Sequence, residues 1–254
     1  MARSADDIEL QVLELIDACE ESVGSGTIHL ALKGRGVTIS QPTIGRLLRT
    51  YDHRRWTEKL SNRGRALTER GRDHLQSLRL LEKRKRLAQQ IVEAVSPATL
   101  RDLRDVLVAR RALEREIARL AAIKATPAQI SELQAAVREQ EVALTAGEKV
   151  GDEALRFHLI LAEASSNHFL EIAANLIRTD HEPLEEMMYQ LGSTVGGDSL
   201  THHKAIAKAV FRGDPEASER AMVVHMDQYL SYVDSLLKKS LGSDLMLSSL
   251  SPKR

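Results

Sequence analysis

The chain has 254 residues, of which 43% are hydrophobic and 28% are charged. This balance is typical of a folded globular protein, and the length is enough for two domains with hydrophobic cores. The single Cys19 excludes a disulfide framework and a cysteine-rich zinc module. The first residues carry no secretory signal, and no apolar run is long enough to span a membrane. We therefore expect a cytoplasmic protein that has no contact with membranes.

The net charge of zero conceals a strongly basic block. Residues 33–86 contain 16 lysine and arginine residues against 5 aspartate and glutamate residues, so the rest of the chain is acidic. A basic block of this length is typical of a module that binds a polyanion, because phosphate neutralisation is driven by charge. A solvated helical face explains the charges alone equally well. The predicted elements within the block have to decide between the two interpretations.

The first 74 residues have the element order of a winged helix-turn-helix. Apolar residues at helical spacing predict three helices, over residues 8–19, 25–32 and 41–51. Ser40 is suited to cap the third helix, and Pro42 fits its first turn. Two short strands are predicted over residues 56–60 and 65–67, joined by a tight turn at 61–64. In this architecture the third helix enters the major groove of double-stranded DNA and the hairpin lies on the backbone.

The residues expected to face DNA lie on the third helix and on the hairpin. An arginine can bind guanine through two hydrogen bonds, whereas contacts with phosphate only set the register. The candidates are Ser40, Gln41, Thr43, Arg46 and Arg49 on the helix, and Arg63 and Arg65 on the hairpin. Each arginine taken alone is also consistent with a solvated surface. Charge and element order together favour DNA binding.

The segment from Gly24 to Gly71 resembles a known winged helix. It contains "GVTISQPTIGRLLRTYD" and "WTEKLSNRGRALTERG", and a Gly-Ser pair begins its second helix. In these features it is similar to the winged helix of NrpR-type regulators and of ribonuclease R. One departure is Gln41-Pro42, which stands where a Glu/Arg-type pair is more usual and leaves the base preference open.

The remainder of the chain is predicted to be helical. A linking helix is expected over residues 69–96, and Pro97 follows its end. Further helices are predicted over residues 99–124, 126–144, 152–164, 168–189, 199–211 and 215–241, with a restart or kink at Glu182-Pro183 and a flexible loop at 192–197. Such a series makes an all-α bundle. We thus expect a winged-helix domain (1–74), a linking helix (75–97), a helical ligand-sensing and dimerisation domain (98–241) and a flexible tail (242–254).

Three histidines of the predicted bundle form a candidate metal site. His158, His203 and His225 lie on three different helices, and the last two belong to consecutive helices that can face one another. Three imidazoles that meet in a bundle core can hold one divalent ion such as zinc, nickel or copper. The alternative is that each is an ordinary histidine, hydrogen-bonded within the core.

Residues 99–240 resemble the ligand-binding domain of FadR-type members of the GntR regulator family (the FCD domain). The resemblance rests on "RRALE" at 110–114, "FHLILAEASSN" at 157–167 and the pattern from His203 to His225 that contains Gly213-Asp214. It implies an all-helical dimeric sensor whose pocket often holds zinc or another divalent ion, on which a small carboxylate effector docks. By position, the implied metal ligands are His158, His203 and His225.

Two residues near this motif bear on the ligand. Many metal-binding members have an aspartate four residues before the first histidine, but here that position is Ala154, so water or an effector oxygen would have to complete the coordination. Arg110 is a candidate partner for an acidic effector, because its guanidinium matches a carboxylate. An ion pair between Arg110 and Glu114, one helical turn later, is the alternative.

We expect a DNA-binding transcriptional regulator, and not an enzyme. A homodimer would bind double-stranded DNA, and a small-molecule effector would bind in the helical domain and change the affinity for DNA. Two alternatives are a metal-dependent hydrolase of a small molecule and a helical nucleic-acid-binding scaffold that has no effector. No general base beside His158, no phosphate-binding loop and no nucleophile motif is evident for the hydrolase.

Overall fold

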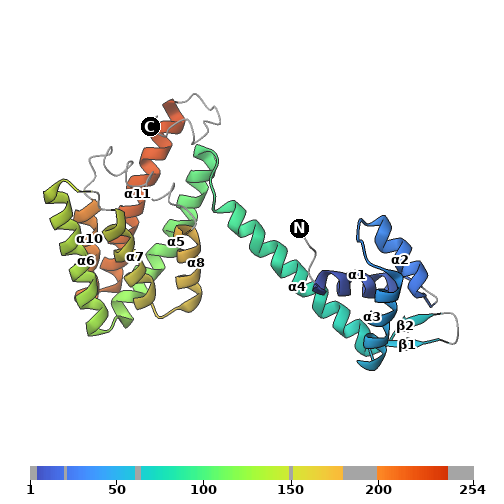
Figure 1. The fold of residues 1–254 in the computed structure, drawn as a ribbon. Coiled ribbons are helices and arrows are strands. Elements are labelled where there is room, and N and C mark those ends of the chain that lie inside the picture. The colour runs from blue at the N-terminus through green and yellow to red at the C-terminus, as the bar shows by residue number, and fades with distance from the viewer. Residues whose placement is uncertain (1–4, 20–21, 61–63, 149–150, 180–198, 240–254) are drawn as a thin grey trace. The chain divides into compact units, whose positions relative to one another are not determined.

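The computed structural model describes residues 5–19, 22–60, 64–148, 151–179 and 199–239. The chain divides into two compact units, Met1–Gln90 and Ile91–Arg254. Helices dominate the described residues, and their one sheet is a two-stranded hairpin, as the sequence predicts (Figure 1). No helix in these ranges is both long and apolar enough for a membrane span. The predicted kink at Glu182-Pro183, the loop at 192–197 and the tail at 242–254 lie outside the described residues.

The first unit contains the predicted winged helix. Its elements are α1 (Ala5–Asp17), α2 (Ser25–Gly34), α3 (Gln41–His53), β1 (Thr57–Lys59), β2 (Arg65–Leu67) and the start of α4 (Glu69–Ala94). The strands are antiparallel, and Thr57 pairs with Leu67. On its other side β2 pairs with Val23 through two backbone hydrogen bonds of 3.0 Å. The hairpin is therefore joined to the segment between α1 and α2.

The ends and the buried face of α3 follow from its sequence. The backbone N–H of Thr43 donates to the Ser40 hydroxyl at 3.3 Å, which satisfies one of the unpaired donors of the first turn. Pro42 occupies the first turn, where a missing N–H costs little. Ile44, Leu48 and Tyr51 lie at helical spacing and are almost completely buried. This packing leaves the opposite face of α3 in solvent.

Gly71 lies where α4 passes the hairpin too closely for any side chain. A Cβ atom added there would lie 1.9 Å from the backbone oxygen of Trp56. We expect Gly71→Ala to lower the free energy of unfolding of the first unit by roughly 1–3 kcal/mol, the usual cost of overpacking. Thermal unfolding measures the effect. Gly34→Ala is the control, because a Cβ at Gly34 meets nothing within 4 Å, and equal behaviour of the two variants would contradict the prediction.

The second unit is an all-α bundle. Its described helices are α5 (Leu100–Lys124), α6 (Pro127–Ala146), α7 (Gly151–Ala164), α8 (His168–Thr179), α10 (Ser199–Phe211) and α11 (Pro215–Lys239). Figure 1 shows α5 and α11 side by side, and α5 also packs against α7, α8 and α10. Capping boxes at Thr99 and Thr126 begin α5 and α6. Helix α5 thus packs against most of the other described helices, whereas α6 packs against α7 and α10.

Candidate nucleic-acid interface and candidate metal centre

The solvent-facing side of α3 carries most of the residues predicted to face DNA. Ser40, Gln41, Arg46 and Arg49 are exposed, and Thr43 is partly exposed. The Arg46 guanidinium donates to the Thr43 hydroxyl at 3.1 Å, and the Ser40 and Thr43 hydroxyls are 2.8 Å apart. Two guanidinium groups and the polar N-terminus of one helix therefore share an accessible face. This surface has the chemistry that phosphates and base edges require.

Arg65 of the hairpin has a structural partner. Its side chain is 17% exposed, and its guanidinium donates to both Asp52 oxygens at 2.8–2.9 Å. Burial raises the pKa of Asp52, but hydrogen bonds from Arg65 and Thr57 outweigh burial and hold that pKa below its ordinary value. Arg65 thus fastens the hairpin to the end of α3. The other predicted wing residue, Arg63, lies outside the described residues.

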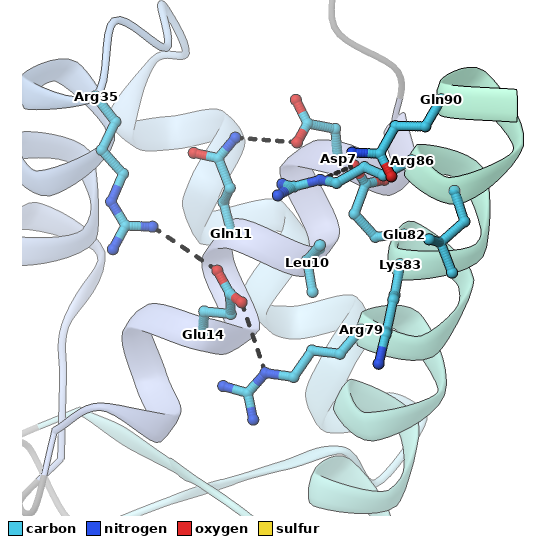
Figure 2. Close-up of a pocket in the computed structure, with 11 residues that line it drawn as sticks. Asp7, Leu10, Gln11, Glu14, Arg35, Arg79, Glu82, Lys83, Arg86 and Gln90 are labelled. Atoms are coloured by element: carbon cyan, nitrogen blue, oxygen red, sulfur yellow. Dashed lines mark hydrogen bonds and ion pairs between the residues drawn. The ribbon is translucent and has the colours of Figure 1, made fainter. Parts of the chain in front are cut away.

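A groove of about 590 Å³ lies between α1 and α4 of the same unit (Figure 2). Figure 2 shows Glu14 between two guanidinium groups, and its oxygens lie 4.0 Å from Arg35 and 3.6 Å from Arg79. Arg86 pairs with Glu82 in the same groove. Part of the basic block is therefore neutralised within the unit, in contrast to the arginines on α3.

The three predicted metal histidines come together in the core of the second unit. All three are buried: His158 of α7, His203 of α10 and His225 of α11. Each offers one ring nitrogen, and these three nitrogens all lie within 4.8 Å of one another. Phe157 stacks on His203, with 4.3 Å between the ring centroids. The sequence thus correctly predicted that these three rings converge, although their separation along the chain gives no distance.

The protonation of this cluster suits a metal ion. Burial, followed by the charge of the neighbouring histidine, lowers the pKa of His203 and of His225 well below the ordinary value. Neutral imidazoles are the form that coordinates a cation. Among the described residues, His203 Nε2 and His225 Nδ1 are buried without a hydrogen-bond partner. Buried polar atoms are normally hydrogen-bonded, so these two nitrogens fit the role of metal ligands.

A buried ion cluster adjoins the histidines. Glu114 is 1% exposed, and its Oε1 accepts hydrogen bonds from Arg110 Nε at 3.2 Å and from Arg178 Nη2. The structure thus contains the Arg110–Glu114 pair that was the alternative to an effector-binding Arg110. Arg178, which is 2% exposed, is a member of this cluster that no sequence pattern predicted. A buried carboxylate between two guanidinium groups is an unusual feature of a helical core and marks a polar centre.

Comparison with known proteins supports both domain assignments. The family model described as "FCD domain" matches residues 105–228, and that described as "Ribonuclease R winged-helix domain" matches residues 10–75. The second unit is therefore similar to an FCD domain over residues 105–228. The resemblance to the FCD-containing GntR regulators and the resemblance to the winged helix of ribonuclease R are both confirmed.

Curated relatives match about half of the chain. One is an Escherichia coli (strain K12) protein named "Putative L-lactate dehydrogenase operon regulatory protein", 31% identical over 53% of this chain and 51% of its own length. Another is "HTH-type transcriptional regulator LutR" of Bacillus subtilis (strain 168), 31% identical over 54% of this chain and 66% of its own length. A solved structure described as Streptococcus agalactiae GntR covers 89% of this chain and 98% of its own, with 22% identity and a TM-score of 0.45. By their names the two curated relatives are regulators.

The helical unit departs from the FCD pattern at one residue near the histidines. Ala154 of α7 lies one turn before His158 and is partly buried. A methyl group therefore occupies the place where the resemblance implies an aspartate. The nearby carboxylate is instead Glu114 of α5, whose Oε2 lies 3.2 Å from His158 Nδ1.

Proposed function

We propose that this protein is a DNA-binding transcriptional regulator. The winged helix binds double-stranded DNA through α3, with Ser40, Gln41, Thr43, Arg46 and Arg49 at the interface, and Arg63, between the two strands in the sequence, is a further candidate contact. The FCD domain binds a small carboxylate effector and changes the affinity for DNA. The observation that carries the proposal is the presence in one chain of a winged helix with exposed arginines on α3 and an FCD domain with a buried cluster of three histidines.

In this proposal His158, His203 and His225 hold a divalent cation such as zinc or nickel. When bound, that cation supplies an electrophilic centre to which a carboxylate oxygen can coordinate. The chain supplies the rest of the site: three buried imidazoles and the guanidinium of Arg110. The pKa of His203 is lowered first by burial, then by the charges of the neighbouring histidines, and then by the charge of Arg110. We propose Arg110 as a partner of the effector's carboxylate.

The proposal includes a homodimer. A two-fold symmetric dimer presents two α3 helices and therefore reads two half-sites, whose centres lie one helical turn of DNA apart or a multiple of it. An effector changes the affinity for DNA only if it binds the two arrangements of the dimer differently. Couplings of this kind are typically about 5–150-fold.

Selection of genomic fragments by the purified protein tests the proposal. The fragments should contain an inverted repeat, and the affinity for the best one should change about 5–150-fold when the effector binds. Two relatives carry the name of an L-lactate dehydrogenase operon, so L-lactate is the first carboxylate to test, with zinc and with a chelator. Failure to bind any duplex DNA at low salt would refute the proposal. If no small carboxylate altered the affinity for DNA, the proposal that the effector is a carboxylate would be wrong.

A further inference from the structure

Two histidines of the cluster each direct one ring nitrogen toward a buried oxygen on another helix. His158 Nδ1 lies 3.2 Å from Glu114 Oε2, and His203 Nδ1 lies 2.8 Å from Gln140 Oε1. Glu114 belongs to α5 and Gln140 to α6, and each is 1% exposed. Both contacts therefore lie in a dry environment, where a hydrogen bond has no competition from solvent.

The chemistry of the two oxygens determines which nitrogen carries the proton. An ionised carboxylate and an amide oxygen can only accept hydrogen bonds, so the Nδ1 atom of each ring has to be the donor. A neutral imidazole has one N–H and one lone pair, and the lone pair is then on Nε2. His203 Nε2 is one of the buried nitrogens with no hydrogen-bond partner among the described residues, as this assignment requires.

We propose that Glu114 and Gln140 are positioning residues that hold His158 and His203 as Nδ1–H tautomers, in which the lone pair of each ring is on Nε2, the nitrogen that can coordinate a divalent cation. This inference rests on the part of the proposed function in which the three histidines hold a divalent cation. It adds two residues that make no bond to the cation. Partners of this kind fix the orientation of a ligating ring and raise its basicity, and their loss typically costs about 10–100-fold in metal affinity.

Glu114 is suited to this role because it is held in place itself. Arg110 and Arg178 donate to its Oε1, which leaves Oε2 for His158. The two guanidinium groups compensate the charge of the buried carboxylate, since an unpaired charge in the core is costly. Gln140 has no charge, so the two histidines differ in their outer partners.

Zinc affinity and histidine tautomers, measured in the full-length protein, test the proposal. The variants are Gln140→Leu, which removes the acceptor of His203 without changing a charge, and Glu114→Gln. The controls are Gln134→Leu, partly buried on α6, and Glu132→Gln, exposed on α6. Competition with a chromophoric chelator should show about 10–100-fold weaker zinc binding for Gln140→Leu and no change for the controls. The loss should be smaller for Glu114→Gln, because its amide oxygen can still accept from His158 Nδ1. Nitrogen-15 NMR of the zinc-free parent should show the Nδ1–H tautomer for His158 and His203, and Gln140→Leu should abolish this preference for His203.

Three results would overturn the proposal: no zinc binding by the parent protein, parental zinc affinity in both variants, or the Nε2–H tautomer at either ring. Circular dichroism checks that the variants are folded. If Glu114→Gln does not fold, Gln140→Leu alone decides the outcome, because it leaves every buried charge paired. None of these measurements involves DNA, so failure here is distinguishable from failure of the proposed regulator to bind duplex DNA.

Discussion

Replacing His203 with alanine is expected to weaken zinc binding by more than about 100-fold. The loss of an outer partner alone costs roughly 10–100-fold, and the loss of a ligand removes a bond to the ion itself. His203 is completely buried, and its Nε2 has no hydrogen-bond partner among the described residues. A chelator competition assay on the full-length protein measures the affinity.

The matched control is His168→Ala. The side chain of His168 is 84% exposed on α8, so its removal should leave the zinc affinity at the parental value. Because the alanine at position 203 also leaves a cavity beside Phe157, the two variants have to be compared at a temperature at which both are folded. Unchanged zinc affinity in His203→Ala would show that the histidine cluster is an ordinary part of the core.

The second large effect concerns Arg178. Replacing it with alanine is expected to lower the free energy of unfolding of the helical unit by about 3–5 kcal/mol, the usual cost of removing one partner of a buried ion pair. Arg178 is 2% exposed and donates to Glu114, so its loss leaves a cavity and a less well compensated carboxylate. For a chain of this size the melting temperature should fall by roughly 10 °C.

Arg156→Ala is the matched control for Arg178. Arg156 also donates to a glutamate, Glu139, but both side chains are about half exposed. Exposed pairs contribute roughly 0–1 kcal/mol, so this variant should melt within a few degrees of the parent protein. Differential scanning calorimetry measures both. Similar melting temperatures for the two variants would contradict a structural role for the Glu114 ion cluster.

Patterns within short segments of the sequence predicted much of the structure of the N-terminal unit. Ser40 and Pro42 mark the start of α3, and the apolar spacing of Ile44, Leu48 and Tyr51 gives its buried face. The sequence could not predict that Arg65 binds Asp52, because this pairing depends on how the hairpin packs against the end of α3. The charge of a segment predicts a basic surface, but tertiary contacts decide which of its arginines are exposed.

The polar centre of the helical unit was predicted only in part. Leu103, Leu107, Arg110, Glu114 and Ile117 follow one another at intervals of three or four residues, and all five are buried. The same spacing from Leu133 through Val137 includes Gln140 in the buried face of α6. This periodicity was a usable signal that Glu114 and Gln140 are internal.

Arg178 carries no comparable signal. It lies in the last turn of α8, where a basic residue is usually solvated and interacts with the helix dipole. Its burial results from the packing of α8 against α5, which brings it to Glu114. Long-range packing of this kind is not encoded in the local sequence.

The salt dependence of DNA binding tests the central claim most directly, namely that the winged helix binds duplex DNA through the exposed face of α3. With a selected genomic fragment, the affinity of the parent protein should fall about 10³–10⁵-fold between 50 and 200 mM salt if 6–10 phosphates are contacted. The double variant Arg46→Ala/Arg49→Ala should bind DNA at least about tenfold more weakly than the parent protein at low salt. The control is Arg138→Ala/Arg212→Ala, which removes two exposed arginines of the helical unit. This control should bind DNA as the parent protein does. Equal binding by both double variants, or an affinity independent of salt, would contradict the account.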